Sequence, residues 1–297
     1  MPARLASIAT VSAALLAAVL PAAARSDPCS DAVQALPARP ADAPSGSEFA
    51  RRVADLSGVS RDQAVLEQLR AGNVPAFLRH AVPVEFAGRS ASGAALRVTL
   101  CVLPDYLAVG SDRDFLRVPL GLNAALEAAE AFGFTLPTTR IVDVIYAQAT
   151  VRLAPQPLPP GDAMRSTGYV VRHNALVQAA RDAACAPNTA LTAGDKKDVV
   201  LTNLLWATAG RVAIYGWHRA PGAPIQPLST VHGERYADYS HGVRLVGTTA
   251  WVDGRPMSIF DVLGSASLAG ALSDEGPLAR VRALAAPARV ASLGDAH

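Results

Sequence analysis

Three of the chain's six histidines lie within one stretch, residues 212–246, which reads VAIYGWHRAPGAPIQPLSTVHGERYADYSHGVRLV. They are His218, His232 and His241, and Asp238 lies between the last two. Imidazole and carboxylate groups can exchange protons near neutral pH and can bind transition metals. This stretch is therefore the first candidate for a site that performs chemistry.

A metal site is one interpretation of these residues. His232, Asp238 and His241 supply two imidazoles and one carboxylate, which zinc accepts as ligands, and His218 could complete a tetrahedral set or support the ligands from behind. The spacing matches no named metal motif, because the chain contains neither HExxH nor CxxC. A divalent metal such as zinc is thus compatible with the residue types, although the spacing is not diagnostic.

Proton transfer without a metal is the second interpretation. Asp238 could orient one of the imidazoles, as a carboxylate does in many acid–base sites. Lys197 and Asp198 lie in the preceding segment GDKKDVVLT and would join the site if the strands are neighbours. Tyr239 or Lys197 could then stabilise negative charge that develops on a substrate.

Nucleophilic catalysis is less well supported by the sequence. Ser240 precedes His241, but neighbouring residues of an extended strand point to opposite faces, so these two cannot form a dyad. Ser240 would need His218 or His232 instead, and no GxSxG elbow occurs. Cys101 lies in an apolar run, where a thiol is more often a packing or disulfide residue.

The same residues also fit two roles without catalysis. Tyr236 and Tyr239 could bury their rings and bond the backbone with their hydroxyl groups, as parts of a polar network that pins the loops. Alternatively, Trp217, Tyr236, Tyr239 and Trp251 could form an aromatic platform that binds a sugar or peptide, with Gln226 as a further binding residue.

The elements around these residues have the pattern of an antiparallel sheet. Apolar, β-branched runs at 197–202, 212–215 and 241–246 are separated by loops rich in Gly and Pro. A further strand at 249–252 turns at Asp253–Gly254, which is typical of a hairpin. The C-terminal half therefore predicts a sheet that holds the polar residues at its strand ends.

The N-terminal half is predominantly helical in pattern. Apolar residues recur at helical spacing in several segments, and the Pro-rich segment 154–161 predicts an extended connector. Residues 96–102 alternate as in a half-buried strand. The predicted helices cover 60–72, 123–132, 136–149 and 173–184. The expected fold class is α+β, with a helical N-terminal half packed on an antiparallel sheet formed mainly by the C-terminal half.

The termini of the chain differ from its centre in composition. Residues 1–24 have one arginine, an apolar run and small residues at the end, the pattern of a secretory signal peptide. Residues 25–47 are rich in Pro, Ala and Ser and predict a flexible linker. We expect one globular domain over 48–285 and a frayed tail over 286–297.

Charge and cysteine content narrow the possible partners. The formal net charge is only +2 and no basic stripe occurs, so nucleic acid is not expected as a partner. After signal removal no apolar run is long enough for stable membrane insertion. Of the three cysteines, Cys101 and Cys185 could pair in an oxidising compartment and leave Cys29 in the N-terminal linker.

Several blocks of the sequence resemble a family of secreted bacterial proteins to which no activity is assigned. The blocks are GDKKDVVLT, VAIYGWH and PIQPLSTVHGERYADYSHGVRLV. The resemblance covers about residues 51–262 and implies that this span is one unit. It also implies a histidine at the position of Asp195, which argues against a direct catalytic role for that residue.

Together these features predict a secreted or periplasmic hydrolase that acts on an extracellular or cell-envelope polymer, either peptide or glycan. The expected catalytic residues are His218, His232, Asp238, His241, Lys197 and Asp198. The alternative is a secreted binding protein that recognises a sugar or peptide without cleaving it. The choice of an envelope polymer depends on the predicted export alone.

Overall fold

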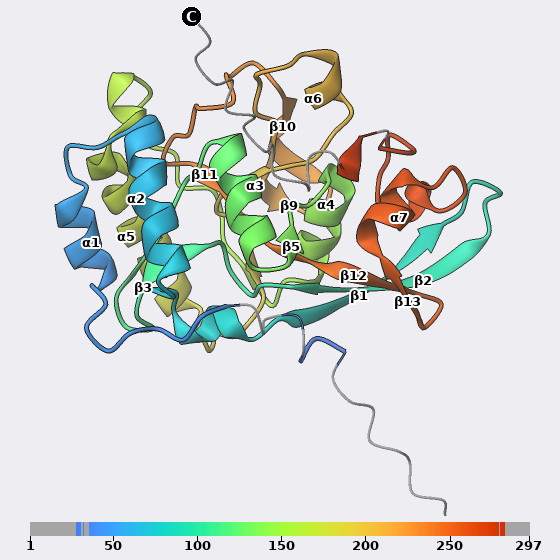
Figure 1. The fold of residues 1–297 in the computed structure, drawn as a ribbon, viewed down its shortest axis with the longest axis horizontal. Helices are drawn as coiled ribbons and strands as arrows, with labels where there is room; N and C mark the ends of the chain where they lie inside the picture. Colours follow the sequence, from blue (N-terminus) through green and yellow to red (C-terminus); the bar gives the residue numbers. More distant parts are fainter. Residues whose placement is uncertain (1–27, 31, 33–35, 279, 283–297) are drawn as a thin grey trace, which may run out of the picture.

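The computed structural model describes residues 28–30, 32, 36–278 and 280–282. The expected signal peptide and C-terminal tail lie outside these residues. Helices are concentrated in the N-terminal half and strands in the C-terminal half, which confirms the predicted α+β class. In Figure 1, α1, α2 and α5 lie at one end of the molecule, and α7 lies at the other end with the β1–β2 hairpin.

The first sheet is antiparallel and has the order β1-β2-β12-β13, with β5 also paired to β12. Its strands are β1 (Val82–Arg89), β2 (Ala95–Val102), β5 (Phe134–Thr135), β12 (Val246–Val252) and β13 (Arg255–Ser258). The predicted strand at 96–102 is confirmed, whereas β1 was not predicted. The turn between β12 and β13 contains Asp253 and Gly254, both with positive φ, as a tight hairpin turn requires.

The second sheet has the order β10-β9-β8-β11. Its strands are β8 (Lys197–Val199), β9 (Ile214–Ala220), β10 (Ala223–Ser229) and β11 (His241–Gly242). All pairs are antiparallel except β8 with β11, which run parallel and place Lys197 beside His241. Through this parallel pair, Lys197 and Asp198 lie beside His241 and Gly242, which follow Asp238 in the chain.

Two short ribbons complete the strand content of the described residues. They are the antiparallel pair β3 (Ala108–Gly110) and β4 (Phe115–Arg117), and the parallel pair β6 (Val151–Arg152) and β7 (Thr192–Ala193). Between β6 and α5 the chain has no strand over 153–160, in agreement with the predicted Pro-rich connector.

Helices α1, α4 and α5 begin after residues whose side chains accept hydrogen bonds from free backbone N–H groups. The helices are α1 (Gly46–Arg52), α2 (Gly58–Arg70), α3 (Leu122–Ala131), α4 (Thr139–Gln148), α5 (Thr167–Ala183), α6 (Leu204–Ala207) and α7 (Ile259–Gly264). Ser45 forms a capping box with Glu48, and Ser166 accepts a hydrogen bond from the Tyr169 N–H. Because Ser166 caps α5, this helix begins six residues before the predicted start, and His173 lies in its interior.

Helix α4 links the two sheets. It packs against β1 of the first sheet and β9 of the second, with Ile141 and Ile145 in the common hydrophobic core. The apolar residues at helical spacing in the predicted helix 136–149 thus include these two buried residues. Asp143 lies off that face, where its side chain is available to residues of β9. None of the described helices has the length and apolar character needed to cross a membrane.

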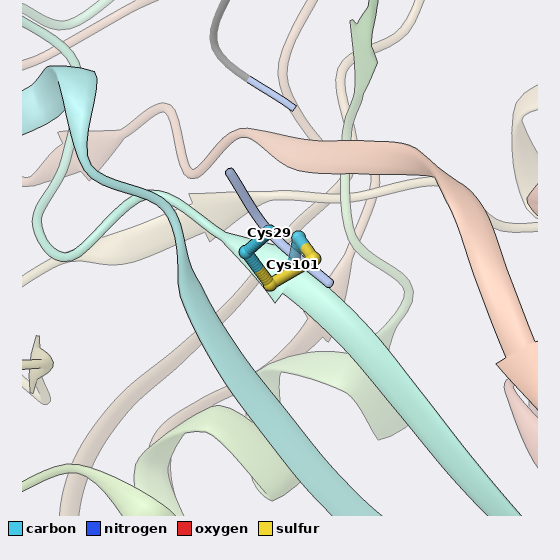
Figure 2. The surroundings of a disulfide bond; sticks show 2 residues. All are labelled: Cys29 and Cys101. Carbon is cyan, nitrogen blue, oxygen red and sulfur yellow. A yellow bond between two sulfur atoms is a disulfide. The ribbon is translucent and has the colours of Figure 1, made fainter. Parts of the chain in front are cut away.

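The disulfide joins Cys29 to Cys101, so the predicted pairing of Cys101 with Cys185 is wrong. Figure 2 shows the bond at the C-terminal end of β2, where Cys101 is buried. Cys185 is exposed and follows the end of α5, on a different part of the chain. Sequence spacing cannot distinguish these pairings, because the strand position of Cys101 alone does not determine its neighbour.

Part of the predicted linker lies against the domain. The Arg39 guanidinium donates from Nε to Asn73 Oδ1 at 2.9 Å and to the Gly110 carbonyl oxygen at 3.0 Å. Leu36 is buried in the hydrophobic core. The disulfide and these contacts therefore fasten the described part of the N-terminal segment to the β2 and β3 region.

We expect Cys29→Ser to lower the free energy of unfolding by roughly 4 kcal/mol, the chain-entropy value for a loop of this size. The bond closes a loop with a sequence separation of 72 residues. Urea unfolding under non-reducing conditions measures the effect. Cys185→Ser is the matched control, since its exposed thiol should change stability by less than about 0.5 kcal/mol. Equal midpoints for Cys29→Ser and wild type would contradict the expectation.

Candidate functional site

The candidate site lies where β11 begins beside β8. Asp238 starts a tight turn in which its Oδ1 accepts hydrogen bonds from the Ser240 N–H at 2.8 Å and from the Ser240 hydroxyl at 2.6 Å. After this turn the chain enters β11, where His241 is paired with Lys197 of β8. An aspartate favours such a turn because its short side chain bonds the backbone two residues on.

His241 is completely buried. Neither Nδ1 nor Nε2 of its ring has a hydrogen-bond partner among the residues that the structure describes. Burial lowers the pKa of His241 to about 4, although the charge of Asp238 opposes this. The imidazole is therefore neutral at pH 7, with a nitrogen able to accept a proton.

Two aromatic rings lie in sequence next to His241, the first in contact with it and the second stacked on the first. The Tyr236 ring lies 5.7 Å from the His241 ring, and the half-buried His232 ring stacks on Tyr236 at 3.9 Å. The Tyr236 hydroxyl donates to Asp238 Oδ2 at 3.1 Å. With the hydrogen bonds from Ser240, both carboxylate oxygens of Asp238 are thus occupied.

Lys197 completes this group. Its Nζ lies 4.9 Å from the centre of the Trp217 ring, a cation–π contact. Burial lowers the pKa of Lys197, and the Asp238 charge partly offsets this effect. We call these residues the β11 cluster, which comprises Lys197, His232, Tyr236, Asp238, Ser240 and His241.

Two predicted catalytic residues, His218 and Asp198, lie on the opposite face of the second sheet. His218 Nε2 is 2.8 Å from Asp143 Oδ1 on α4, and the Tyr215 hydroxyl donates to the same carboxylate at 2.9 Å. The Tyr146 ring stacks on His218 at 4.6 Å. We call this second group the α4 cluster, which comprises Asp143, Tyr146, Tyr215 and His218.

A local distortion of β9 separates the two groups. Tyr215 and His218 both bond Asp143, although residues three apart in a regular strand point to opposite faces. Gly216 and Trp217 have φ values of 111° and 57°, which break the alternation between them. Trp217 consequently lies beside Lys197, while His218 lies beside α4.

Asp198 lies near the α4 cluster but is itself buried. The Tyr106 hydroxyl donates to its Oδ2 at 3.0 Å. Burial raises the pKa of Asp198 to about 7, and the positive charge of Arg244 only partly offsets this. The carboxyl group is thus held in a setting that disfavours its charge at neutral pH.

We expect Asp198→Asn to be more stable than wild type at high pH. An acid whose pKa rises from 3.8 to about 7 on folding loses stability as pH rises through this range, by up to roughly 4 kcal/mol. Asparagine avoids this loss and can still accept the Tyr106 hydrogen bond. Thermal unfolding between pH 4 and 9 should show the two curves diverging as pH rises. The exposed Asp55→Asn is the control, and parallel curves for Asp198→Asn and wild type would contradict the assignment.

A third group of polar residues lies behind the β11 cluster and was not predicted as part of the site. Lys196 Nζ donates to the Tyr239 carbonyl oxygen at 2.7 Å and lies 3.1 Å from His173 Nδ1. Burial, followed by the Lys196 charge, lowers the pKa of His173 to about 2. Both oxygens of the buried Asp195 lack hydrogen-bond partners in the described part of the chain. In the sequence, the only signal for this group is the adjacent pair Lys196 and Lys197. His173 gives no such signal because it lies in α5, far from them along the chain.

The residues predicted to bind a substrate through aromatic surface are not displayed together. Trp217 is only 7% exposed and Tyr239 only 2% exposed. The Tyr239 hydroxyl accepts a hydrogen bond from the Leu158 N–H of the Pro-rich connector at 2.8 Å. The Gln226 side-chain amide donates to the Pro227 carbonyl oxygen on β10. Only Tyr236 of this group lies half-exposed in the β11 cluster.

The side chains of His232, Asp238 and His241 do not fit a zinc ion. Among the described residues no group of three or more His, Cys, Asp or Glu side chains is arranged to hold a metal. Asp238 directs its oxygens to Ser240 and Tyr236, while the His232 ring lies flat on Tyr236 at an interplanar angle of 9°. With Asp238 and His232 held in these contacts, the predicted ligands do not converge on one metal position.

The nucleophiles considered from the sequence also have other partners. Ser240 bonds Asp238 rather than an imidazole, and Cys101 is in the disulfide. The arrangement that remains is a neutral imidazole flanked by a carboxylate and a lysine. Such a group can accept a proton from water and stabilise the charges that result.

No protein-family profile matches the chain, and neither a curated protein nor a solved structure is similar to it at a significant level. The chemistry of the β11 cluster is therefore the basis on which a function can be assigned.

Proposed function

We propose that the protein is a secreted or periplasmic hydrolase that acts on an extracellular or cell-envelope polymer, with His241 as general base. The observation that carries the proposal is the neutral imidazole of His241, which has no hydrogen-bond partner among the described residues and lies beside Asp238 and Lys197. A buried polar group without a hydrogen bond costs about 1–3 kcal/mol, and such costs concentrate at functional sites.

The proposed step begins with a water molecule next to the His241 ring. His241 accepts a proton as the water oxygen attacks the substrate, and it returns the proton to the leaving group when the bond breaks. Asp238 stabilises the transient imidazolium. Burial raises the pKa of Asp238, but the charge of a protonated His241, the hydrogen bonds from Ser240 and the Lys197 charge outweigh this and lower it, so the carboxylate is ionised beside the imidazolium. Lys197 stabilises negative charge on the substrate.

Access to His241 requires the covering side chains to move. His241 is buried, whereas the adjoining Tyr236 and His232 rings are half-buried and the neighbouring Val231 is 71% exposed. Loops that carry covering residues move readily because few buried contacts restrain them. We propose that substrate binding displaces the Tyr236 ring from His241 and leaves Asp238 in its turn.

The location in this proposal is supported by the disulfide. The Cys29–Cys101 bond suits an oxidising compartment, such as the periplasm or the exterior of the cell. The N-terminal sequence pattern favours export as well. The polymer substrates follow from that location, since they are the hydrolysable material outside the cytoplasm.

The competing proposal of a non-catalytic aromatic platform is less well supported. The burial of Trp217 and Tyr239 leaves too little ring surface for a planar sugar or peptide contact. Both residues instead hold neighbouring segments: the Trp217 indole N–H donates to the Asp195 carbonyl oxygen at 3.0 Å.

Incubation of the purified protein with cell-envelope peptidoglycan and with model peptides and glycans tests the proposal. We expect wild type to release soluble fragments or new chain ends, detected by mass spectrometry. Activity should survive chelators, because the proposed step uses no metal ligand. Absence of hydrolysis across both polymer classes would rule the proposal out, and the variants described in the Discussion assign any activity to the β11 cluster.

A further inference from the structure

A second site lies between α2, α3 and the segment that precedes Asp238. The cavity has a volume of about 300 Å³, at the small end for ligand pockets. Its lining includes Val59, Asp62 and Leu66 of α2, Glu127 of α3, and Glu234 and Arg235. It is distinct from the β11 cluster, none of whose members line it.

Asp62 is the central polar residue of this cavity, and it is only 5% exposed. Its Oδ2 accepts a hydrogen bond from the Gly121 N–H at 3.0 Å. Its Oδ1 has no hydrogen-bond partner in the part of the chain that the structure describes. A buried carboxylate with a free oxygen is costly unless a cation or donor meets it.

Beside Asp62, the backbone at Gly121 packs tightly against the segment that contains Glu234. A side chain at Gly121 would place its Cβ 2.8 Å from the Glu234 carbonyl oxygen and 3.1 Å from Asp62 Oδ2. The Leu122 N–H donates to the same carbonyl at 2.7 Å. Glycine thus allows the start of α3 to approach the loop, and the position of Asp62 is held by backbone contacts.

The remaining charges leave the cavity receptive to a cation. Glu127 forms an ion pair with Arg70, whereas Glu234 has no ion pair among the described residues. Arg61 donates its guanidinium hydrogens to the Arg165 and Ala237 carbonyl oxygens, so it reaches Asp62 through charge without a hydrogen bond. Arg235 is the lining cation, which leaves Asp62 and Glu234 as negative groups around a partly apolar space.

The apolar wall determines the kind of cation. Val59 is 43% exposed, and Leu66 and Ala124 lie beside the same cavity. Methylene groups can pack on this surface while a charged end reaches a carboxylate, as lysine side chains do elsewhere in proteins. A compact inorganic cation would gain nothing from these contacts.

We propose that this cavity binds a primary alkylammonium group, with Asp62 as its counter-ion. The chemistry is shared by a free diamine and by a lysine side chain of a peptide. The proposal does not depend on hydrolysis by the β11 cluster, because it concerns a separate set of residues and is tested by binding alone.

Titration with 1,5-diaminopentane and with Nα-acetyl-lysine amide, followed by calorimetry and by NMR of the protein, tests the proposal. We expect both probes to bind and 1-pentanol, their neutral counterpart, not to bind. Tighter binding of the diamine would identify a free amine as the ligand class, and tighter binding of the lysine derivative would identify a peptide side chain. Absence of amine binding, or equal binding of 1-pentanol, would overturn the proposal.

Asp62→Asn should weaken amine binding at least about tenfold, the loss of one charge-assisted hydrogen bond. Asparagine keeps an acceptor for the Gly121 N–H, and Glu234→Gln provides a second test if Asp62→Asn does not fold. Glu67→Gln is the matched control, because it removes an exposed charge from the same helix outside the cavity. Unchanged affinity in both Asp62→Asn and Glu234→Gln would overturn the assignment.

Discussion

The His241→Gln variant is expected to hydrolyse its substrate about 10²- to 10⁴-fold more slowly than wild type, the usual contribution of a general base. Glutamine is polar and of similar length, but it cannot accept a proton near neutral pH. The measurement is kcat on the polymer identified in the hydrolysis assay, with thermal unfolding to confirm that the variant is folded.

Two matched variants make this test specific. His80→Gln changes an exposed histidine and should leave kcat unchanged. His218→Gln breaks the contact with Asp143 in the α4 cluster and should alter kcat far less than His241→Gln. Loss of activity in His218→Gln with full activity in His241→Gln would refute the assignment to the β11 cluster and place the chemistry on the opposite face.

The pH profile gives an independent signature of the same base. His241 acts in its neutral form, and burial lowers its pKa to about 4. Activity should therefore fall as pH drops through about 4 and remain constant above it. As pH rises, activity should fall again when Lys197 loses its charge. This loss should occur below pH 10.5, the ordinary pKa of lysine, because burial lowers the pKa of Lys197. An acid limb near pH 6.5, typical of an unperturbed histidine, would contradict His241 as the base.

The largest effect on stability is expected from Arg117→Met, which should lower the free energy of unfolding by about 3–5 kcal/mol. Arg117 is 1% exposed, and its Nη2 donates to Asp105 Oδ2 at 2.6 Å while its Nε contacts both carboxylate oxygens. Burial raises the pKa of Asp105, but the Arg117 charge and hydrogen bonds outweigh this and lower it. The variant leaves Asp105 charged, buried and without its main partner.

Urea unfolding measures this loss, and a second ion pair provides the control. Arg140 and Asp274 are bonded at 3.0 Å, but the Asp274 side chain is 60% exposed. Asp274→Asn should therefore change stability by less than about 1 kcal/mol, the range for surface ion pairs. If Arg117→Met costs no more than Asp274→Asn, the nearby Arg181 is sufficient to compensate Asp105.

Local sequence patterns predicted the regular elements better than their pairing. The strand at 96–102 and the helices at 123–132 and 136–149 follow from hydrophobic periodicity, because each buries one face. The strand β1 was missed because Pro83 and Gly88 interrupt a short alternating run. The start of α5 was missed because its cap, Ser166, lies within a polar segment.

Only the part of the candidate site formed by residues close together in the sequence could be predicted. Asp238 and His241 are local to one turn, so the sequence could place them together. Lys197 reaches His241 through parallel pairing of β8 and β11, which no local pattern specifies. Asp143 and His173 come from helices, and nothing in their own segments marks them as partners of His218 or Lys196.

The distortion at Gly216 and Trp217 also determines which mutations this strand can accept over evolution. Regular extended backbone at these two residues would restore strict alternation and turn His218 away from Asp143, toward the side of Lys197. Substitutions at the exposed Arg219 change no such relationship. We therefore expect homologous chains to vary in residue type along β9 but to keep glycine at position 216, because its φ of 111° favours glycine and regular alternation would exchange the contents of the two faces.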